Sequence, residues 1–369
     1  MCVKFLNAQG LIACQGFVAV YGPETAGFGA MMYLLVLGGL VLLLAGGEAL
    51  VRGSVSVARK LNISELVIGL TLVGFGTSVP ELVTSLQAVE RDAVGIAVGN
   101  VVGSNIANIF LVLALAALIA PIAVHPNAII RDGAVMIGAT MLLCGLLWFD
   151  AFTRIGGFVL VGLLIAYLGF SLLADQTRGG APAELHKAEG ETVTAQYGLV
   201  TGLLIAVVGL AGVVAGANLL VTGSVSLARS FGISETVIGL TIVAIGTSLP
   251  ELATTIVAAY RRKADVAIGN IIGSNIFNIL GILGITALIQ PFSVRGDTSA
   301  AAMAGDQPVS MISSTDVGAL VLAALLLVLF ALTGRKIARW EGGVLLLGYV
   351  TYMGLTFNLI PQMNLIPNV

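Results

Sequence analysis

The sequence predicts an all-α membrane protein of ten transmembrane helices, built as two five-helix repeats that enter the bilayer from opposite sides. The first observation is composition: 58% of the 369 residues are hydrophobic and 10% are charged, against roughly a quarter charged in soluble domains. A soluble globule would have too little polar surface to cover so much apolar side chain. The second is that apolar runs of about twenty residues recur, the length that crosses a bilayer. The third is an internal duplication.

Ten apolar runs bounded by charged or polar residues are the predicted spans. In the first repeat, residues 31–174, they lie near 31–49, 63–87, 96–120, 128–148 and 155–174. In the second repeat, residues 198–360, they lie near 198–218, 233–259, 266–290, 316–333 and 341–360. We expect residues 1–30 to form a poorly ordered N-terminal extension, residues 175–197 a solvated linker, and residues 361–369 a C-terminal tail.

A shift of 170 residues superimposes the two halves of the sequence. The shift places Gly-Thr-Ser-Val-Pro-Glu, which ends at Glu81, on Gly-Thr-Ser-Leu-Pro-Glu, which ends at Glu251. It also places the Gly-Ser-Asn segment at 103–105 on the one at 273–275. From 50 to 124, 41 of 75 positions are identical without a gap. The halves are therefore duplicated copies of one unit.

The number of spans in each copy sets their relative orientation. Each repeat holds an odd number of spans, so the second copy enters from the opposite side, as in the inverted repeats of many secondary transporters. Lys and Arg positions test this arrangement, since cytoplasmic connections are enriched in these residues. With the N-terminus outside, twelve of the 17 Lys and Arg residues fall in inner connections and five in outer ones. The count favours both termini outside and the linker in the cytoplasm.

An ionisable group deep inside a membrane span costs roughly 2.5–3.5 kcal/mol to insert and usually marks a functional site. Two acidic residues lie well inside predicted spans, each in the second span of its repeat. They are Glu81 and Glu251, at equivalent places in the two copies. The preceding Gly-Thr-Ser-x-Pro sequence predicts a break in each helix, because proline removes a backbone donor and glycine loosens the chain. We expect the break to leave carbonyls at about Gly74 and Ala244 without intrahelical partners, which a membrane tolerates only beside a cavity or binding site.

Neutral oxygen donors accompany the two glutamates. The third span of each copy carries Gly-Asn-x-x-Gly-Ser-Asn-x-x-Asn, where we expect a second break. The hydroxyl groups of both motifs belong to Thr77, Ser78, Ser104, Thr247, Ser248 and Ser274. The amide groups, three residues apart on one helical face, belong to Asn105, Asn108, Asn275 and Asn278. Such oxygen atoms bind Ca²⁺ and Na⁺ rather than zinc or copper.

Each feature also has a purely structural interpretation. A Gly- and Ser-rich face in a membrane helix is usually a packing surface, and a lone Thr-Ser-x-Pro is usually a kink. The duplication favours a binding site, because packing alone does not require a carboxylate at equivalent places in two inverted copies. Glu48 lacks this support, since its counterpart is Asn218 and it lies near a predicted span end. We expect Glu48 to act at the membrane boundary or in support of the ion ligands.

These paired motifs resemble the alpha-repeats of the sodium/calcium exchanger family, within the cation/calcium exchanger superfamily. The likeness covers Met31 to about Ile360, and the short linker is similar to the minimal prokaryotic type. The resemblance implies ten helices in inverted repeats, with a gating bundle of the first and sixth spans that slides against the other eight. It also implies that Glu81 and Glu251 are the principal calcium ligands. Calcium and flanking sodium sites would be lined by Thr77, Ser78, Ser104, Asn108, Thr247, Ser248, Ser274 and Asn278. Some relatives, including potassium-dependent exchangers, carry aspartate where this chain has Asn278. The amide at this position therefore argues against a potassium requirement.

The expected function is secondary antiport of Ca²⁺ against Na⁺ by alternating access, with both ions as substrates and no other cofactor. An H⁺/Ca²⁺ antiporter is an open alternative, because glutamates carry protons as well as bind sodium. A passive cation channel is less favoured, since inverted repeats place the site off a pore axis. No zinc-protease helix or nucleophile with a base indicates an enzyme. We expect a monomer in the plasma (inner) membrane and, without a basic patch, no nucleic-acid partner.

Overall fold

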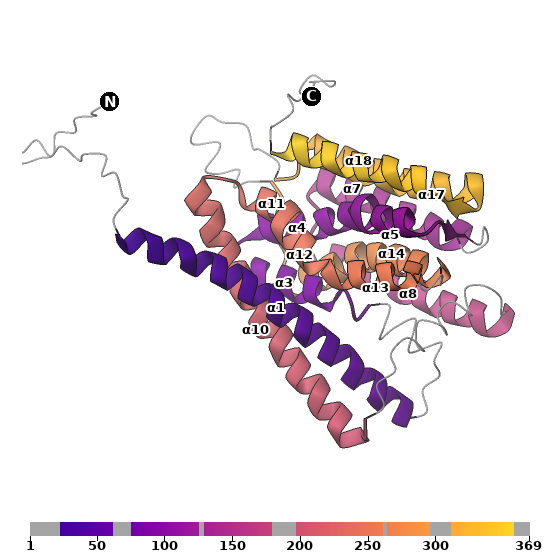
Figure 1. Cartoon of the computed structure of the whole chain (residues 1–369), viewed down its shortest axis with the longest axis horizontal. Coiled ribbons are helices and arrows are strands. Elements are labelled where there is room, and N and C mark those ends of the chain that lie inside the picture. The colour runs from indigo at the N-terminus through magenta and orange to yellow at the C-terminus, as the bar shows by residue number, and fades with distance from the viewer. Residues whose placement is uncertain are drawn as a thin grey trace, which may run out of the picture.

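The computed structural model describes residues 23–61, 75–124, 129–178, 197–260, 264–295 and 311–357. Within these ranges the chain is helical apart from turns and one pair of two-residue strands (Figure 1). The predicted all-α class is confirmed. The N-terminal residues 1–22, most of the linker and the C-terminal tail lie outside the described residues.

The longest helices are α1 (Pro23–Lys60) and α10 (Leu199–Phe231), with 38 and 33 residues. They pack against each other and run obliquely to the remaining helices (Figure 1). The candidate membrane span within α1 begins at Met31, as expected, but both helices run past the expected span ends at 49 and 218. Polar residues beyond those ends, such as Ser56 and Ser224, are buried. At 1.5 Å per residue α1 is about 57 Å long, so it must be tilted or extend beyond the hydrocarbon layer.

The glutamate-bearing segment of the second half is broken, as predicted. Its first part joins α11 (Glu235–Ile238), the π-helical η4 (Gly239–Val243) and α12 (Ala244–Thr247). Its second part is α13 (Leu249–Tyr260), bent by 45° from the first. In the first half, α3 (Val79–Glu90) follows a turn over residues 75–78, with Pro80 in its first turn.

The third span of each half is continuous, so the break expected there is wrong. One consists of α4 (Val94–Ala107), η2 (Asn108–Leu113) and α5 (Ala114–Ile119). The other consists of α14 (Ala264–Ile276), η5 (Phe277–Leu283) and α15 (Gly284–Ile289). Neither stretch contains proline, so the backbone keeps its donors and widens into a π-helical segment instead of breaking. Such segments are frequent at functional sites.

Four further helices complete the bundle. They are α7 (Ala134–Phe149), which follows the π-helical η3 (Ile129–Gly133), α8 (Arg154–Arg178), α17 (Ser314–Gly334) and α18 (Arg339–Thr356). The two strands, β1 (Ile122–Ala123) and β2 (Lys336–Ile337), pair antiparallel. This pairing ties the end of α5 to the turn between α17 and α18.

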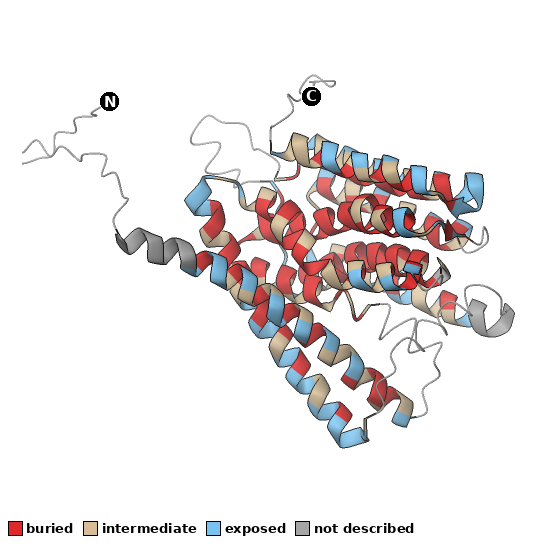
Figure 2. Ribbon diagram, in the orientation of Figure 1, coloured by how far each residue is buried: buried red, intermediate tan, exposed pale blue. Residues whose placement is uncertain are grey.

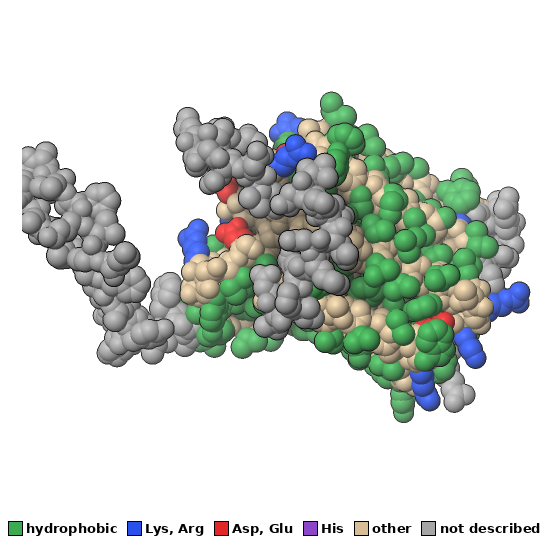
Figure 3. Space-filling model, turned by 90° about the horizontal axis from the view of Figure 1, so that it is seen from above, with side chains coloured by type: hydrophobic (Ala, Val, Ile, Leu, Met, Phe, Trp, Pro, Cys, Tyr) green, Lys and Arg blue, Asp and Glu red, His purple; other side chains and the backbone are tan. Residues whose placement is uncertain are grey.

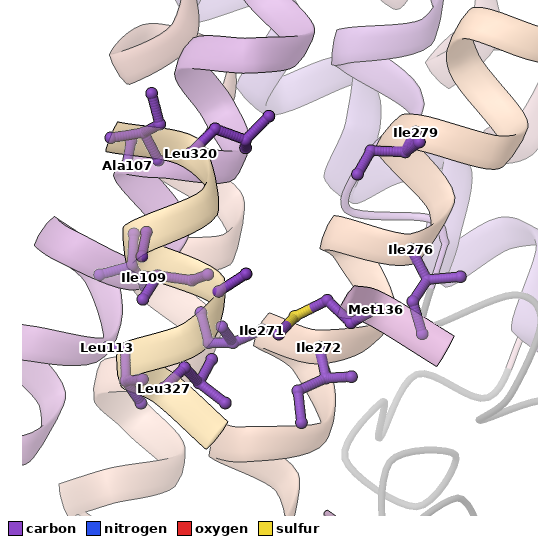
Figure 4. Close-up of a cluster of buried hydrophobic side chains, with 14 of the residues drawn as sticks. Ala107, Ile109, Leu113, Met136, Ile271, Ile272, Ile276, Ile279, Leu320 and Leu327 are labelled. Atoms are coloured by element: carbon purple, nitrogen blue, oxygen red, sulfur yellow. The ribbon is translucent and has the colours of Figure 1, made fainter. Parts of the chain in front are cut away.

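The two π-helical spans form the centre of the molecule. In the most apolar 18-residue stretch of each span, Val94–Ile119 and Val266–Ile289, 78% and 83% of the residues are buried, and Figure 2 shows the buried residues gathered there. Figure 4 shows Met136 of α7 and Leu327 of α17 beside isoleucines of these spans, such as Ile109 and Ile271. The site helices are thus held in a dense apolar core.

The outer surface is apolar. Figure 3 shows hydrophobic side chains over the flank of the molecule, with Lys and Arg toward its margins. Among the described residues, seven helices are long and apolar enough to cross a membrane, or eight if the bent pair is one span. The chain is therefore a multi-pass membrane protein. The count of ten stays a prediction, because residues 63–74 of the second predicted span and 358–360 of the tenth are outside the described ranges.

Candidate cation-binding site

The two intramembrane glutamates occupy matching positions at helix starts. Glu81 is in the first turn of α3 and Glu251 is in the first turn of α13. Both side chains are fully buried. Their positions at helix N-termini stabilise negative charge through the helix dipole. The local sequence produces this placement, because proline is compatible with the first turn of a helix but not with its interior.

Each carboxylate receives a hydrogen bond from the opposite half of the chain. The Ser78 hydroxyl donates to Glu251 Oε1 at 2.7 Å, and the Ser248 hydroxyl donates to Glu81 Oε1 at 3.3 Å. Ser274 donates to Glu251 Oε1 at 3.4 Å. The two carboxylates are close enough to repel each other electrostatically. The two copies of the motif therefore meet in one buried polar cluster.

Several buried polar atoms in the two glutamate motifs and in the third spans have no hydrogen-bond partner among the described residues. They are Glu81 Oε2, Glu251 Oε2, Thr77 Oγ1, Thr84 Oγ1 and both side-chain polar atoms of Asn108 and Asn278. Thr77 also lies beside the Glu251 carboxylate. An unsatisfied buried polar group costs about 1–3 kcal/mol, and more when charged. Native proteins rarely leave so many together, so this arrangement fits a ligand that these oxygens bind.

Two asparagines hold α3 and α13, the helices whose first turns contain the glutamates. Neither asparagine was predicted to have a role. Asn100 Nδ2 of α4 donates to the backbone oxygen of Glu81 at 3.2 Å and to Ser85 Oγ at 3.0 Å. Asn270 Nδ2 of α14 makes the equivalent bonds, to the backbone oxygen of Glu251 at 3.4 Å and to Thr255 Oγ1 at 3.0 Å. The repeated Gly-Asn dipeptide was the signal that could have identified them.

Asn100 also connects the two halves. Its Oδ1 accepts hydrogen bonds from Thr247 Oγ1 at 3.0 Å and from Ser104 Oγ at 3.5 Å. Two of the predicted hydroxyl donors therefore contact this amide. Thr247 also lies beside the Glu81 carboxylate, and Ser104 remains adjacent to Glu81 because Asn100 contacts the Glu81 backbone.

Some predicted features differ in detail. The Ala244 carbonyl is not free, because it accepts the backbone N–H of Ser248 at 3.1 Å. Proline removes the donor to the carbonyl four residues before it, which for Pro250 is that of Gly246. Gly74, the predicted counterpart of Ala244 in the first repeat, lies outside the described residues.

The amides of the Gly-Ser-Asn segments do not all face the carboxylates. Asn105 Nδ2 donates to the Val101 carbonyl at 2.7 Å, and Asn275 Nδ2 contacts the sulfur of Met136 in α7 at 3.9 Å. The role expected of Glu48, at the membrane boundary or in support of the ion ligands, stays a prediction. Because α1 continues to Lys60, Glu48 is within the helix, where it pairs with Arg52 one turn later on an exposed face.

The donor set determines the chemistry available to the site. In the described ranges, no group of three or more His, Cys, Asp or Glu side chains is gathered to hold a metal. The cluster instead combines two carboxylates with hydroxyl and amide oxygens. These are hard ligands, which suit Ca²⁺ and Na⁺.

Comparison with known proteins identifies the family. The sequence pattern of the family described as "sodium/calcium exchanger protein" matches residues 31–173 and 201–358. The chain belongs to the sodium/calcium exchanger family. The putative antiporter CaxA of Alkalimonas amylolytica is 41% identical over 331 residues, covering 88% of this chain and 98% of CaxA. The sodium/calcium exchanger MaX1 of Methanosarcina acetivorans is 35% identical over 357 residues, with the same coverages.

The fold is also similar to a solved member of the exchanger family. The structure of the sodium-calcium exchanger NCX_Mj soaked with 2.5 mM Na⁺ and 0.1 mM Ca²⁺ is 34% identical, with a TM-score of 0.56 over 88% of this chain and 97% of that one. Membership in this exchanger family makes the chain a membrane transporter and not an enzyme.

Proposed function

We propose that the protein is a secondary antiporter that exchanges Ca²⁺ for Na⁺ across the membrane by alternating access. The observation that carries the proposal is the pair of fully buried carboxylates, Glu81 and Glu251, each hydrogen-bonded by a serine of the opposite repeat. Each retains one oxygen without a partner among the described residues. A divalent cation between them would satisfy both.

The ligands would come from both repeats. Glu81 and Glu251 would contribute the charge, and the flanking sodium sites would use neutral oxygens. Those neutral oxygens would belong to Thr77, Ser78, Ser104, Asn108, Thr247, Ser248, Ser274 and Asn278, with backbone carbonyls near Gly74 and Ala244. The Ala244 carbonyl can take part although it accepts the Ser248 N–H, because a carbonyl oxygen has two lone pairs.

Charge explains the coupling. Two ionised glutamates leave an empty site with a charge of about −2, which is costly to enclose in a medium of low dielectric constant. One Ca²⁺ neutralises this charge, and so do two Na⁺. Loaded states can therefore pass through an occluded conformation, whereas the empty state cannot. An additional Na⁺ held by hydroxyl and carbonyl oxygens would make the exchange electrogenic.

The architecture in the membrane follows from the duplication. We place ten spans as two inverted five-helix repeats, with both termini outside and the linker 175–197 in the cytoplasm. The protein acts as a monomer in the plasma (inner) membrane and uses no cofactor besides the transported ions. The tilted pair α1 and α10 would slide against the other helices. Such movement of one bundle around a fixed site is the usual route of alternating access in inverted repeats.

Flux measurements in proteoliposomes test the coupling. Radiolabelled Ca²⁺ uptake should depend on an outward Na⁺ gradient and should cease when Na⁺ is replaced by choline. A pH gradient imposed without Na⁺ tests the H⁺/Ca²⁺ alternative, which the two adjacent carboxylates also permit. Uptake driven by the pH gradient alone would replace the sodium proposal. Unitary currents with no counter-ion requirement would indicate a channel and overturn antiport.

A further inference from the structure

A cavity of about 550 Å³ opens at one end of the helix bundle, where α13 ends at Tyr260. Residues 119–123, the end of α13, the first residue of α14 and Arg339 line it. Four helix ends meet at this level: α5 ends at Ile119, α13 at Tyr260 and α17 at Gly334, and α18 begins at Arg339. A level at which several membrane helices end together is where lipid headgroups are expected. We call it the α5–α18 pocket.

The rim of the α5–α18 pocket is positively charged. Arg339 is the charged side chain of its lining, and its guanidinium donates to the Ile119 carbonyl at 3.1 Å, which holds the group at the opening. Lys336 faces Ala123, another lining residue, across the strand pair β1–β2. Arg335 precedes it, and all three cations are exposed. Arg339 therefore lines the open cavity, and Lys336 is paired with one of its lining residues.

The equivalent place at the opposite end of the bundle is filled. The repeat places Gln290 where the pocket has Ala120, and Phe292 where it has Ile122. The Gln290 side chain donates to the Val89 carbonyl at 3.0 Å, and the Phe292 ring stacks on Phe152 at 4.8 Å. Ala120 cannot make such a bridge to Ala259, the counterpart of Val89, because it has only a methyl group. Among the described residues, the side chains of Gln290 and Phe292 thus fill a place that Ala120 and Ile122 leave open.

The two ends of the bundle also differ in which charged residues occupy equivalent positions. Asp150 and Arg335 are counterparts, each with positive φ directly after α7 or α17. Asp150 accepts from Val294 N at 2.7 Å and from Ser293 Oγ at 2.6 Å. Tyr260, which lines the pocket, occupies the position that Glu90 has in the other repeat. At these two positions the opposite end has carboxylates where the pocket end has Arg335 and Tyr260, while both ends keep an arginine at the start of the next helix, Arg154 and Arg339.

We propose that the α5–α18 pocket binds the headgroup of an anionic phospholipid, with its phosphate against Arg339 and Lys336. Basic pockets between helix ends at a membrane face attract such headgroups. The acyl chains would follow the exposed apolar surface beside Ile119. Tyr260 and Trp340, 80% and 66% exposed, would lie at headgroup level, where aromatic side chains gather. This site lies beyond the proposed ion exchange and does not depend on which ion drives it.

The two tryptophans of the chain provide a test with a built-in control. Trp340 follows Arg339 at the pocket, whereas Trp148 lies at the opposite end, where its carbonyl accepts from Arg295. Trp148→Phe leaves Trp340 as the sole reporter, and Trp340→Phe leaves Trp148. Each variant, reconstituted as the full chain, is titrated with brominated phosphatidylglycerol and with brominated phosphatidylcholine. Fluorescence quenching gives the relative affinity of the two lipids at each reporter.

We expect Trp340 to be quenched preferentially by phosphatidylglycerol and Trp148 to show no preference. Arg339→Ala and Lys336→Gln, each in the Trp148→Phe background, should lower the preference by about five-fold, the effect of one cation near a membrane surface. Arg154→Ala, which removes the equivalent cation at the opposite end, should leave it unchanged. Ala120→Gln should also lower it by closing the cavity without altering charge. If Arg339→Ala fails to insert, Lys336→Gln alone decides the role of charge.

Three results would overturn the proposal. The first is equal quenching of Trp340 by the two lipids. The second is an equal preference at Trp148, which would show general surface attraction rather than a site. The third is loss of the preference on addition of inorganic phosphate at constant ionic strength, which would show that the pocket binds a free anion.

Discussion

Ser78 donates a hydrogen bond to Glu251 at 2.7 Å across an interval of 173 residues, and so links the glutamate of one repeat to the helix start of the other. The reciprocal bond, from Ser248 to Glu81, is longer at 3.3 Å. Two motifs that are equivalent in sequence are therefore not equivalent in this structure. The Glu251 side holds its carboxylate with two serines, since Ser274 also donates to it.

The first prediction concerns the carboxylates. Glu81→Gln or Glu251→Gln should each abolish Ca²⁺ transport, because a single remaining charge cannot balance a divalent ion in a low-dielectric site. The decrease should exceed the roughly 10–100-fold loss typical of residues that only support metal ligands. The measurement is Na⁺-dependent uptake of radiolabelled Ca²⁺ into proteoliposomes.

Glu48→Gln is the matched control for these variants. Glu48 is exposed on α1 and pairs with Arg52, so its loss should change uptake much less. Size-exclusion profiles of the three variants should match the parent, which separates a lost site from a lost fold. Normal exchange by either buried variant would refute the site assignment.

The second prediction uses the unequal serine bonds. Ser78→Ala should weaken Ca²⁺ affinity more than Ser248→Ala, because the shorter hydrogen bond to a carboxylate is the stronger one. Losing a hydrogen bond to a charged group costs about 1.5–3 kcal/mol, which corresponds to a rise of roughly ten-fold or more in the half-saturating Ca²⁺ concentration. Calcium titrations of uptake rate measure this. Equal effects in the two variants would show that the 2.7 and 3.3 Å bonds do not persist when the ion binds.

The third prediction concerns Asn100 as a positioning residue. Asn100→Ala removes bonds to the Glu81 backbone, Ser85 and Thr247 together. We expect a loss of Ca²⁺ affinity of about 10–100-fold, as for outer-shell partners of metal ligands, while the maximal rate changes less.

Asn105→Ala on the same helix is the control for Asn100, because its amide donates to the Val101 carbonyl of its own helix. A purely structural role for Asn100 would lower protein yield and thermal stability without a selective change in affinity. Asn270→Ala should reproduce the Asn100 result, since its bonds to Glu251 and Thr255 are equivalent.

The sequence predicted the features that depend on local chemistry and on repetition. The duplication located both glutamates, and the proline motif predicted the bend at Ser248. The ends of α1 and α10 were not predictable, because residues such as Ser56 have the same polarity in a connection and in a buried helix contact. The π-helical segments at Asn108 and Phe277 were missed for a related reason, since asparagine and glycine are compatible with both a break and a wider helix.

Side-chain direction was also beyond the sequence. Asn100 and Asn105 differ only in their place along α4, yet Asn100 contacts Glu81 and Asn105 folds back on its own helix. Periodicity places residues on a face, but the neighbour that each face meets depends on how the two repeats pack. The α5–α18 pocket has the same origin, because Ala120 opens it only where Gln290 closes the equivalent place.

The fourth prediction tests the contact between α1 and α10. A methyl group at Gly46 would lie 2.7 Å from the Val213 backbone nitrogen and 2.8 Å from the Gly209 carbonyl oxygen, so backbone would have to move. Gly46→Ala should therefore destabilise the protein by about 1–3 kcal/mol, the usual cost of overpacking. Gly38→Ala on the same helix adds the same methyl group where no atom lies within 4 Å. Thermal unfolding in detergent should show a lower midpoint for Gly46→Ala than for Gly38→Ala. If α1 and α10 move as one unit, Na⁺-dependent Ca²⁺ uptake should also be lower for Gly46→Ala. Equal midpoints for the two variants would show that α1 and α10 are not packed backbone to backbone at Gly46.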